Sequence, residues 1–213
     1  MSKSKRVLKV LILVLILAVP GFLYYLLTAE GKNRYKPLPI FGPKHLAATS
    51  HTFHGTIIPD TVFHQVADFS LLDQDGKPVS FKTLKDQILV INFFYTHCAD
   101  DCRQMMGNMD SLATYYARNK RVTFLSITVD PQRDNPAVLK SYASTIKPVG
   151  PKWLFLTGDV KVIDTLANKG LLVDALQNGD TFIHSDKLIL LDPEHRIRGY
   201  YSGTSADDVS RLN

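Results

Sequence analysis

A nearly continuous apolar stretch that runs into a pair of cysteines constrains this chain more than any other feature. Residues 88–95 read Ile-Leu-Val-Ile-Asn-Phe-Phe-Tyr, and Cys98 and Cys102 follow directly. Short runs rich in β-branched and aromatic residues are typical of buried strands. A helical pattern starts near Cys102, so the sequence predicts a strand that leads into a helix through the cysteines. Both sulfurs are therefore expected at the C-terminal edge of a sheet.

The spacing of the two cysteines, which are the only ones in the chain, allows two kinds of chemistry. Residues four apart lie on the same face of a helix, so the sulfurs can form a disulfide or bind one metal ion. Asp100 and Asp101 lie between them, and carboxylates disfavour the thiolate that a dithiol oxidoreductase needs. Thiolates select Cu(I) or zinc, and an added imidazole allows Cu(II). The pattern favours a metal site, with a structural disulfide as the alternative.

The N-terminus reads as a membrane anchor. Residues 1–9 contain four basic side chains, and an uncharged run follows from Val10 to Leu27. This length is about enough for a transmembrane helix, which we assign to residues 10–28. Positive charge on the N-terminal side predicts a cytoplasmic N-terminus and a domain in the periplasm of a bacterium. A cleaved signal peptide is the alternative, although the small-residue site around Ala29 is poor.

The basic composition of the chain follows from this segment. The formal net charge is +5, and the four basic residues before the apolar run account for all but one unit of it. The charge therefore reports membrane topology, and it gives no reason to expect binding to nucleic acid.

Residues 29–65 are predicted to form an extended linker that leads into an irregular flap. The segment contains Pro37, Pro39, Pro43 and Pro59 and shows no sustained hydrophobic period. We interpret its histidines as exposed polar residues, with transient metal binding by His51 and His54 as the alternative.

Residues 66–213 are predicted to form one α/β domain. A hairpin with an Asp-Gly turn is expected over 66–81, strands over 122–129 and 153–156, and a late hairpin over 188–201. Helices are expected over 104–119, 136–146 and 159–168, and another begins at 205. Strands that alternate with helices and end in an antiparallel pair indicate a mixed sheet flanked by helices. The short terminal helix is compatible with a frayed end or with a truncated chain.

Three motifs in this order resemble the Sco (SenC) family of copper-binding, thioredoxin-fold assembly proteins. Residues 92–102, Asn-Phe-Phe-Tyr-Thr-His-Cys-Ala-Asp-Asp-Cys, are similar to the family's CxxxC motif. Residues 126–136 resemble its S-x-D-P-x-R-D-x-P stretch, and residues 182–186, Phe-Ile-His-Ser-Asp, resemble the segment with its ligand histidine. The family's prolines beside the cysteines are replaced by Ala99 and Arg103, and Ile183 stands where an acidic residue is common.

The resemblance implies a thioredoxin-like fold in which Cys98, Cys102 and His184 bind copper as Cu(I) or Cu(II). It implies a metallochaperone whose partner is the cytochrome c oxidase subunit that carries the CuA centre, or another periplasmic cuproprotein. The alternative is an enzyme, a thiol–disulfide reductase that uses Cys98 and Cys102 to keep the cysteines of the copper-receiving partner reduced. The segment 181–186 lacks the cis-proline that such enzymes place opposite their cysteines, and this favours metal binding.

Other residues near the cysteines have two interpretations each. Three methionines follow Cys102 at helical spacing: Met105, Met106 and Met109. We expect them to pack in the core, and the alternative is that they relay copper. His97 is an auxiliary ligand or an exposed neighbour. Asp130, Arg133 and Asp134 are expected to cap and brace a loop near the site.

Overall fold

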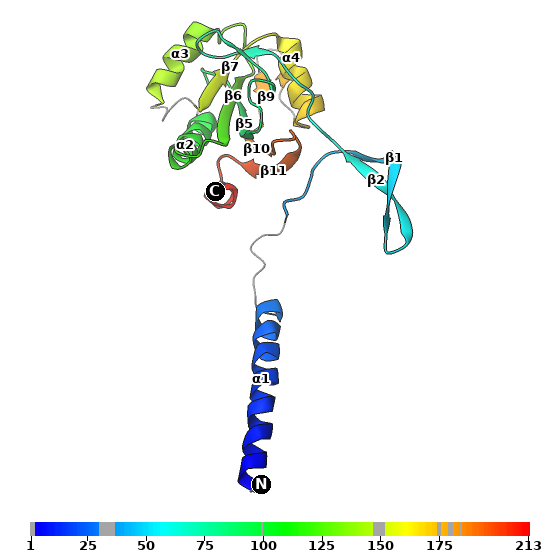
Figure 1. The fold of residues 1–213 in the computed structure, drawn as a ribbon. Coiled ribbons are helices and arrows are strands. Elements are labelled where there is room, and N and C mark those ends of the chain that lie inside the picture. Colours follow the sequence, from blue (N-terminus) through cyan, green and yellow to red (C-terminus); the bar gives the residue numbers. More distant parts are fainter. Residues whose placement is uncertain are drawn as a thin grey trace. The chain divides into compact units, whose positions relative to one another are not determined.

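The computed structural model describes residues 3–29, 37–98, 100–146, 152–173, 176–178, 181–183 and 185–213 (Figure 1). Internal contacts divide the chain into two compact units, Met1–Pro37 and Leu38–Asn213.

In the first unit the structure describes the helix α1, which spans Lys3–Ala29. Its segment Val7–Leu27 has a mean hydropathy of 2.7 and is long and apolar enough to cross a membrane, a test that a signal sequence near an N-terminus also passes. The helix continues through Pro20 and includes the basic residues from Lys3 onward, which were predicted to precede it.

A mixed sheet of five strands forms the centre of the second unit, in the part of the chain that the structure describes. Its strand order is β11-β10-β5-β6-β7. The strands are β5 (Ile88–Phe94), β6 (Val122–Thr128), β7 (Trp153–Leu156), β10 (Lys187–Leu191) and β11 (Ile197–Ser202). The first three are parallel to one another, and β10 joins β5 in antiparallel register and pairs with β11. This arrangement confirms the predicted mixed sheet.

Alternate side chains of β5 enter two different cores. Val90 and Phe94 pack in a cluster with α2 (Asp100–Tyr115), α3 (Pro136–Thr145) and α5 (Ala206–Leu212). Leu89, Ile91 and Phe93 pack on the opposite face. That face is covered by α4 (Val160–Thr165), its continuation into the π-helical turn Leu166–Gly170, and the short strands β3 (Leu71–Leu72) and β4 (Pro78–Val79). Helices and short strands thus cover both faces of the sheet, as expected for strands that alternate with helices.

Side-chain caps start the helices where the sequence predicted them. The side chain of Asn135 accepts a hydrogen bond from the N–H of Val138 at the start of α3, and that of Asp159 accepts one from the N–H of Lys161 at the start of α4. The side chain of Ser205 accepts one from the N–H of Asp208 at the start of α5. Helix α2 begins at Asp100, four residues before the predicted start, and it ends at Tyr115. The predicted helix over 159–168 changes to π-helical bonding at Leu166.

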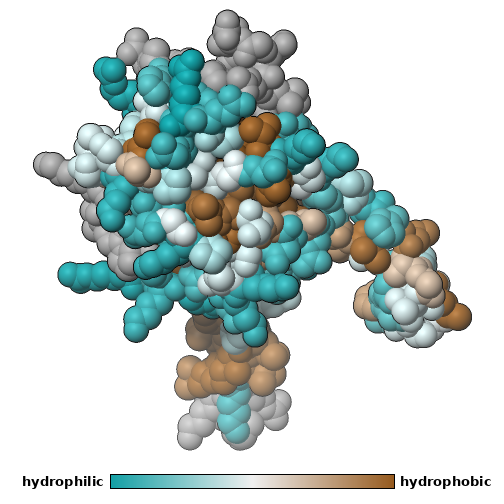
Figure 2. All heavy atoms as spheres, turned by 90° about the horizontal axis from the view of Figure 1, so that it is seen from above, coloured by the Kyte–Doolittle hydropathy of each residue, from teal (hydrophilic) through white to brown (hydrophobic). Residues whose placement is uncertain are grey.

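Two antiparallel hairpins were not predicted. The first joins β1 (Lys44–Phe53) to β2 (Thr56–Phe63), so the prediction of an irregular linker is wrong for this stretch. His54 and Gly55 at its tip have φ of 48° and 80°, the left-handed pair that a two-residue hairpin turn needs. Figure 2 shows apolar side chains along this hairpin, and Leu46, Phe53 and Ile57 are exposed. The second hairpin joins β8 (Leu176–Asn178) to β9 (Thr181–Ile183).

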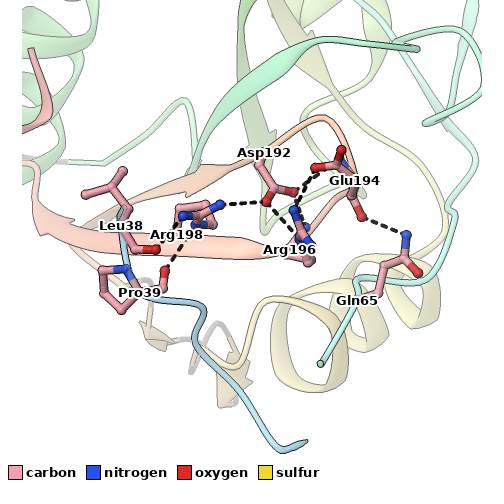
Figure 3. A network of polar contacts seen from close by, with 7 residues as sticks. All are labelled: Leu38, Pro39, Gln65, Asp192, Glu194, Arg196 and Arg198. Carbon is pink, nitrogen blue, oxygen red and sulfur yellow. Dashed lines mark hydrogen bonds and ion pairs between the residues drawn. The ribbon is translucent and has the colours of Figure 1, made fainter. Parts of the chain in front are cut away.

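The start of the second unit is fixed to β11 (Figure 3). The guanidinium of Arg198 donates to the carbonyl oxygens of Leu38 and Pro39, the latter at 3.1 Å. The N–H of Phe41 donates to the carbonyl of Ile197 at 2.9 Å. At the other end of the β1–β2 hairpin, His64 Nε2 donates to the carbonyl of Gly170 at 2.7 Å. Both ends of this hairpin are therefore held against the α/β body.

The carboxylate of Asp192 organises the same region. Its Oδ2 accepts from Arg196 Nε at 2.9 Å and from Arg198 Nη1 at 3.0 Å, and its Oδ1 accepts from the N–H groups of Glu194 and Arg196. Burial raises the pKa of Asp192, but the hydrogen bonds from Arg196 and Arg198 outweigh burial and hold the pKa below its usual value. The ionised carboxylate therefore stabilises the folded state.

Replacing Asp192 with Ala should lower the free energy of unfolding by about 3 kcal/mol, because two arginines lose a largely buried partner. Urea denaturation measures the loss. Asp75→Ala, which removes an exposed ion pair with Lys140, is the control and should change stability much less.

The difference between the parent and Asp192→Asn should depend on pH. Since the folded-state pKa is lowered, the stabilisation is present above the unfolded pKa of about 4 and is lost as the pH falls through the folded value. A difference that stays constant as the pH falls from about 5 to about 2 would contradict this account.

Candidate functional site

The cysteines lie at the carboxyl end of the central strand, as predicted. Strand β5 ends at Phe94, whose carbonyl accepts from the N–H of Val129 at 2.8 Å. The N–H of Cys98 then donates to the carbonyl of Tyr95 at 3.1 Å, and this turn reverses the chain into α2. Cys102 lies in the first turn of α2, on the same face as the methionines that pack against the sheet.

The two sulfurs form a disulfide, with Cα atoms 5.8 Å apart. The pair therefore comes together as the spacing predicted, and of the two chemistries that the spacing allowed the structure shows the disulfide. The two side chains differ in environment. Cys102 is 1% exposed, whereas Cys98 is partly exposed and lines a cavity.

The buried carboxylate of Asp134 connects the cysteine loop to the loop after β6. Its Oδ2 accepts from the N–H of Thr96 at 3.1 Å and from Thr128 Oγ1 at 2.6 Å, and its Oδ1 accepts from Thr96 Oγ1 at 2.5 Å. Asp134 has no exposed surface. These contacts confirm the expected bracing role of Asp134, and they fix the backbone two residues before Cys98.

Asp130 and Arg133 contribute unequally to this brace. The carbonyl of Asp130 accepts from the N–H of Asp134 at 2.9 Å. Arg133 Nε lies 3.6 Å from Asp130 Oδ2, and its side chain is 68% exposed. The arginine therefore adds little to the rigidity of the loop.

The three methionines of α2 pack in the core. Met105, Met106 and Met109 are each at most 3% exposed and face the sheet. Met106 Sδ accepts from Asn92 Nδ2 at 3.4 Å. The amide oxygen of Asn92 accepts from Ser126 Oγ at 2.6 Å, and this hydroxyl accepts from Trp153 Nε1 at 2.8 Å. The core-packing interpretation is supported, and Met106 alone of the three also lines the cavity beside Cys98.

Of the two histidines that were considered as copper ligands, the structure describes His97 but not His184. His184 lies outside the described residues, immediately after β9, and the side chains of Asp100 and Asp101 are not described either. His97 is exposed, and its Nδ1 is hydrogen-bonded to Thr96 Oγ1 at 3.0 Å. Within the described part of the chain, no three His, Cys, Asp or Glu side chains come together as a metal site. The ligand set Cys98, Cys102 and His184 stays a prediction.

A cavity of about 400 Å³ opens beside Cys98, between α2 and α3. Its lining residues are Thr96, Cys98, Arg103, Met106, Gly107, Asp110, Tyr142, Thr145 and Ile146. The ring of Tyr142 stacks on Phe94 with centroids 5.4 Å apart. Burial, with a smaller effect from the charge of Asp134, raises the pKa of Tyr142, so its hydroxyl stays protonated at neutral pH.

This cavity was not predicted from the sequence, although one signal for it was present. Gly107 stands inside the helical pattern that follows the cysteines. A glycine within a helix costs roughly 0.5–1 kcal/mol relative to alanine, so an interior glycine points to a packing or functional requirement.

Replacing Asp134 with Ala should lower the free energy of unfolding by about 3 kcal/mol, because buried donors on Thr96 and Thr128 lose a charged acceptor. The looser loop should also speed reduction of the Cys98–Cys102 disulfide by dithiothreitol. Urea denaturation and a thiol-release assay measure the two effects. Arg133→Ala is the control from the same loop, and equal losses in both variants would show that the carboxylate does not brace the site.

Comparisons with known proteins agree with this geometry. The chain is 32% identical over 162 residues to the SCO1 protein homolog of Bacillus subtilis, covering 73% of this chain and 84% of that protein. One similar solved structure is that of BsSco, which is described as a member of the Sco family of cytochrome c oxidase assembly proteins with a disulfide switch. It is 30% identical to this chain with a TM-score of 0.61, and the match covers 70% of this chain and 91% of BsSco. The structure of ScoI from Bradyrhizobium japonicum with copper bound is 30% identical to this chain with a TM-score of 0.56. The match covers 70% of this chain and 99% of ScoI.

These structural matches confirm the thioredoxin-like fold that the resemblance implied. The family model described as SCO1/SenC matches residues 60–211, which include both cysteines, the brace at Asp134 and the whole central sheet. The chain therefore belongs to the SCO1/SenC family.

Proposed function

We propose that this chain is a membrane-anchored copper metallochaperone that passes copper to the CuA-bearing subunit of cytochrome c oxidase or to another periplasmic cuproprotein. The observation that carries the proposal is the position of two cysteine sulfurs within bonding distance at the end of the central strand. The copper-bound ScoI structure and the description of BsSco as an oxidase assembly protein support it.

The proposed ligands are Cys98, Cys102 and His184, and their donor atoms suit copper. Reduction of the disulfide would supply two neighbouring thiolates from one rigid turn, and thiolates bind Cu(I) strongly. An imidazole adds the donor that Cu(II) favours. A set of three ligands leaves one side of the ion open to a ligand from the receiving protein.

The proposed location is the bacterial inner membrane, with the α/β domain in the periplasm. The apolar segment Val7–Leu27 supports an anchor, and the basic residues before it favour a cytoplasmic N-terminus.

A second candidate function, thiol–disulfide exchange with the copper-receiving partner, is favoured by the disulfide itself. Cys98 and Cys102 in the reduced state would transfer two electrons to a partner disulfide and end in the bonded state that the structure shows. Copper binding and the disulfide use the same two sulfurs, so the two states exclude each other.

The reduced full-length chain in detergent should bind one copper ion, with a thiolate-to-copper charge-transfer band after addition of Cu(II). Cys98→Ser and Cys102→Ser should each abolish the band. His184→Ala should weaken Cu(II) binding far more than Cu(I) binding, because two thiolates still hold Cu(I). Metal analysis, visible absorption and electron paramagnetic resonance measure these outcomes.

His51→Ala is the matched histidine control, since His51 Nδ1 pairs with Asp60 at 2.6 Å on the β1–β2 hairpin. It should leave both affinities unchanged. An oxidised chain that still binds one copper ion tightly would rule out the proposed ligands.

A further inference from the structure

We propose that the cavity beside Cys98 is the docking site for the peptide segment of a partner that carries its disulfide. In this proposal Gly107 keeps the cavity open, and Asp110 accepts a hydrogen bond from a backbone N–H of that segment. The inference rests on the second candidate function, thiol–disulfide exchange at Cys98.

The unequal exposure of the two sulfurs directs exchange to this cavity. Cys98 is partly exposed and lines the cavity, whereas Cys102, in the first turn of α2, is 1% exposed. Thiol–disulfide exchange requires direct access of one sulfur to another. A partner sulfur can therefore reach Cys98 from the cavity, and the backbone around that sulfur has to lie against the walls.

Gly107 forms part of the wall next to Cys98. It is exposed on α2 and has helical backbone geometry, so no left-handed conformation requires a glycine there. An added Cβ would meet no described atom within 4 Å. Packing among the described residues therefore does not require a glycine at this position. Space for an approaching backbone accounts for a glycine that weakens the helix.

Asp110 lies three residues further along the same face of α2 and also lines the cavity. Its Oδ1 is buried and has no hydrogen-bond partner among the described residues. The Asp110 side chain as a whole is only half-buried and lines the cavity, so a donor from a docked molecule can meet its carboxylate at the cavity wall. An extended peptide beside a cysteine offers such donors in its backbone N–H groups.

The exchange step balances within the two proteins. The Cys98 thiolate attacks one sulfur of the partner disulfide, so that a Cys98–partner bond forms and the other partner sulfur leaves as a thiolate. The Cys102 thiolate then attacks Cys98, which forms the Cys98–Cys102 bond and releases the second partner thiolate. Two electrons pass from this chain to the partner, and a dithiol reductant would regenerate the starting state.

The test is a single-turnover assay of the reduced full-length chain in detergent with two disulfides. The first is the disulfide of acetyl-Gly-Cys-Gly-amide, which has backbone N–H groups, and the second is hydroxyethyl disulfide, which has none. Gly107→Leu should slow exchange with the peptide disulfide about tenfold and leave exchange with hydroxyethyl disulfide almost unchanged, because only the peptide needs the cavity. Ser111→Leu, one turn further along the exposed face of α2, should slow neither reaction.

Asp110→Ala should slow the peptide reaction about tenfold through loss of a charged acceptor, and Asp110→Asn should restore most of the rate because its amide keeps an oxygen acceptor. A change in thiol reactivity alone would alter both reactions equally. If Gly107→Leu slows neither reaction in a chain that exchanges normally, the docking site is refuted and exchange stands. If the parent chain reacts with neither disulfide, exchange at Cys98 is refuted as well.

Discussion

Strand β5 is hydrogen-bonded on both edges, to β6 on one side and to β10 on the other, and the position of the cysteines depends on this pairing. Its side chains enter the cores on both faces of the sheet, so the strand can neither shift in register nor rotate without exposing apolar surface. The chain therefore leaves Phe94 in a fixed direction. The buried carboxylate of Asp134 then fixes Thr96, and the disulfide turn follows two residues later.

A polar ladder links the same strand to α2. Trp153, Ser126 and Asn92 are hydrogen-bonded in series across β7, β6 and β5, and the amide of Asn92 donates to the sulfur of Met106. All four side chains are buried. A buried polar group is stable only when its partners are in place, so the ladder penalises any slip between these strands. It also fixes the helix that carries Cys102 and Gly107, so the site depends on the sheet through side chains as well as through the backbone.

The sequence was informative wherever the deciding chemistry is local. The apolar run of β5, the helix starts near Pro136, Asp159 and Ser205, and the Asp75–Gly76 turn each depend on a few neighbouring residues, and the structure confirms them. The β1–β2 hairpin was missed because nearly all its side chains are exposed on both faces, so no alternation of apolar and polar residues marks it; only the His54–Gly55 pair signalled a turn. The cavity beside Cys98 was missed because residues of α2, α3 and the cysteine loop line it, and these segments meet only in the folded chain.

The β1–β2 hairpin leaves and re-enters the body at points that are both tied down, through Phe41 and Ile197 at one end and through His64 and Gly170 at the other. A hairpin whose flanking residues are both hydrogen-bonded to the domain can be lengthened, shortened or exchanged without changing the path of the chain on either side. The hairpin is therefore a position where insertions and replacements should be tolerated. Related chains could differ widely in this arm while keeping an identical cysteine turn, and a tag or cross-linker placed at His54 would report on the surroundings of the domain without touching its chemistry.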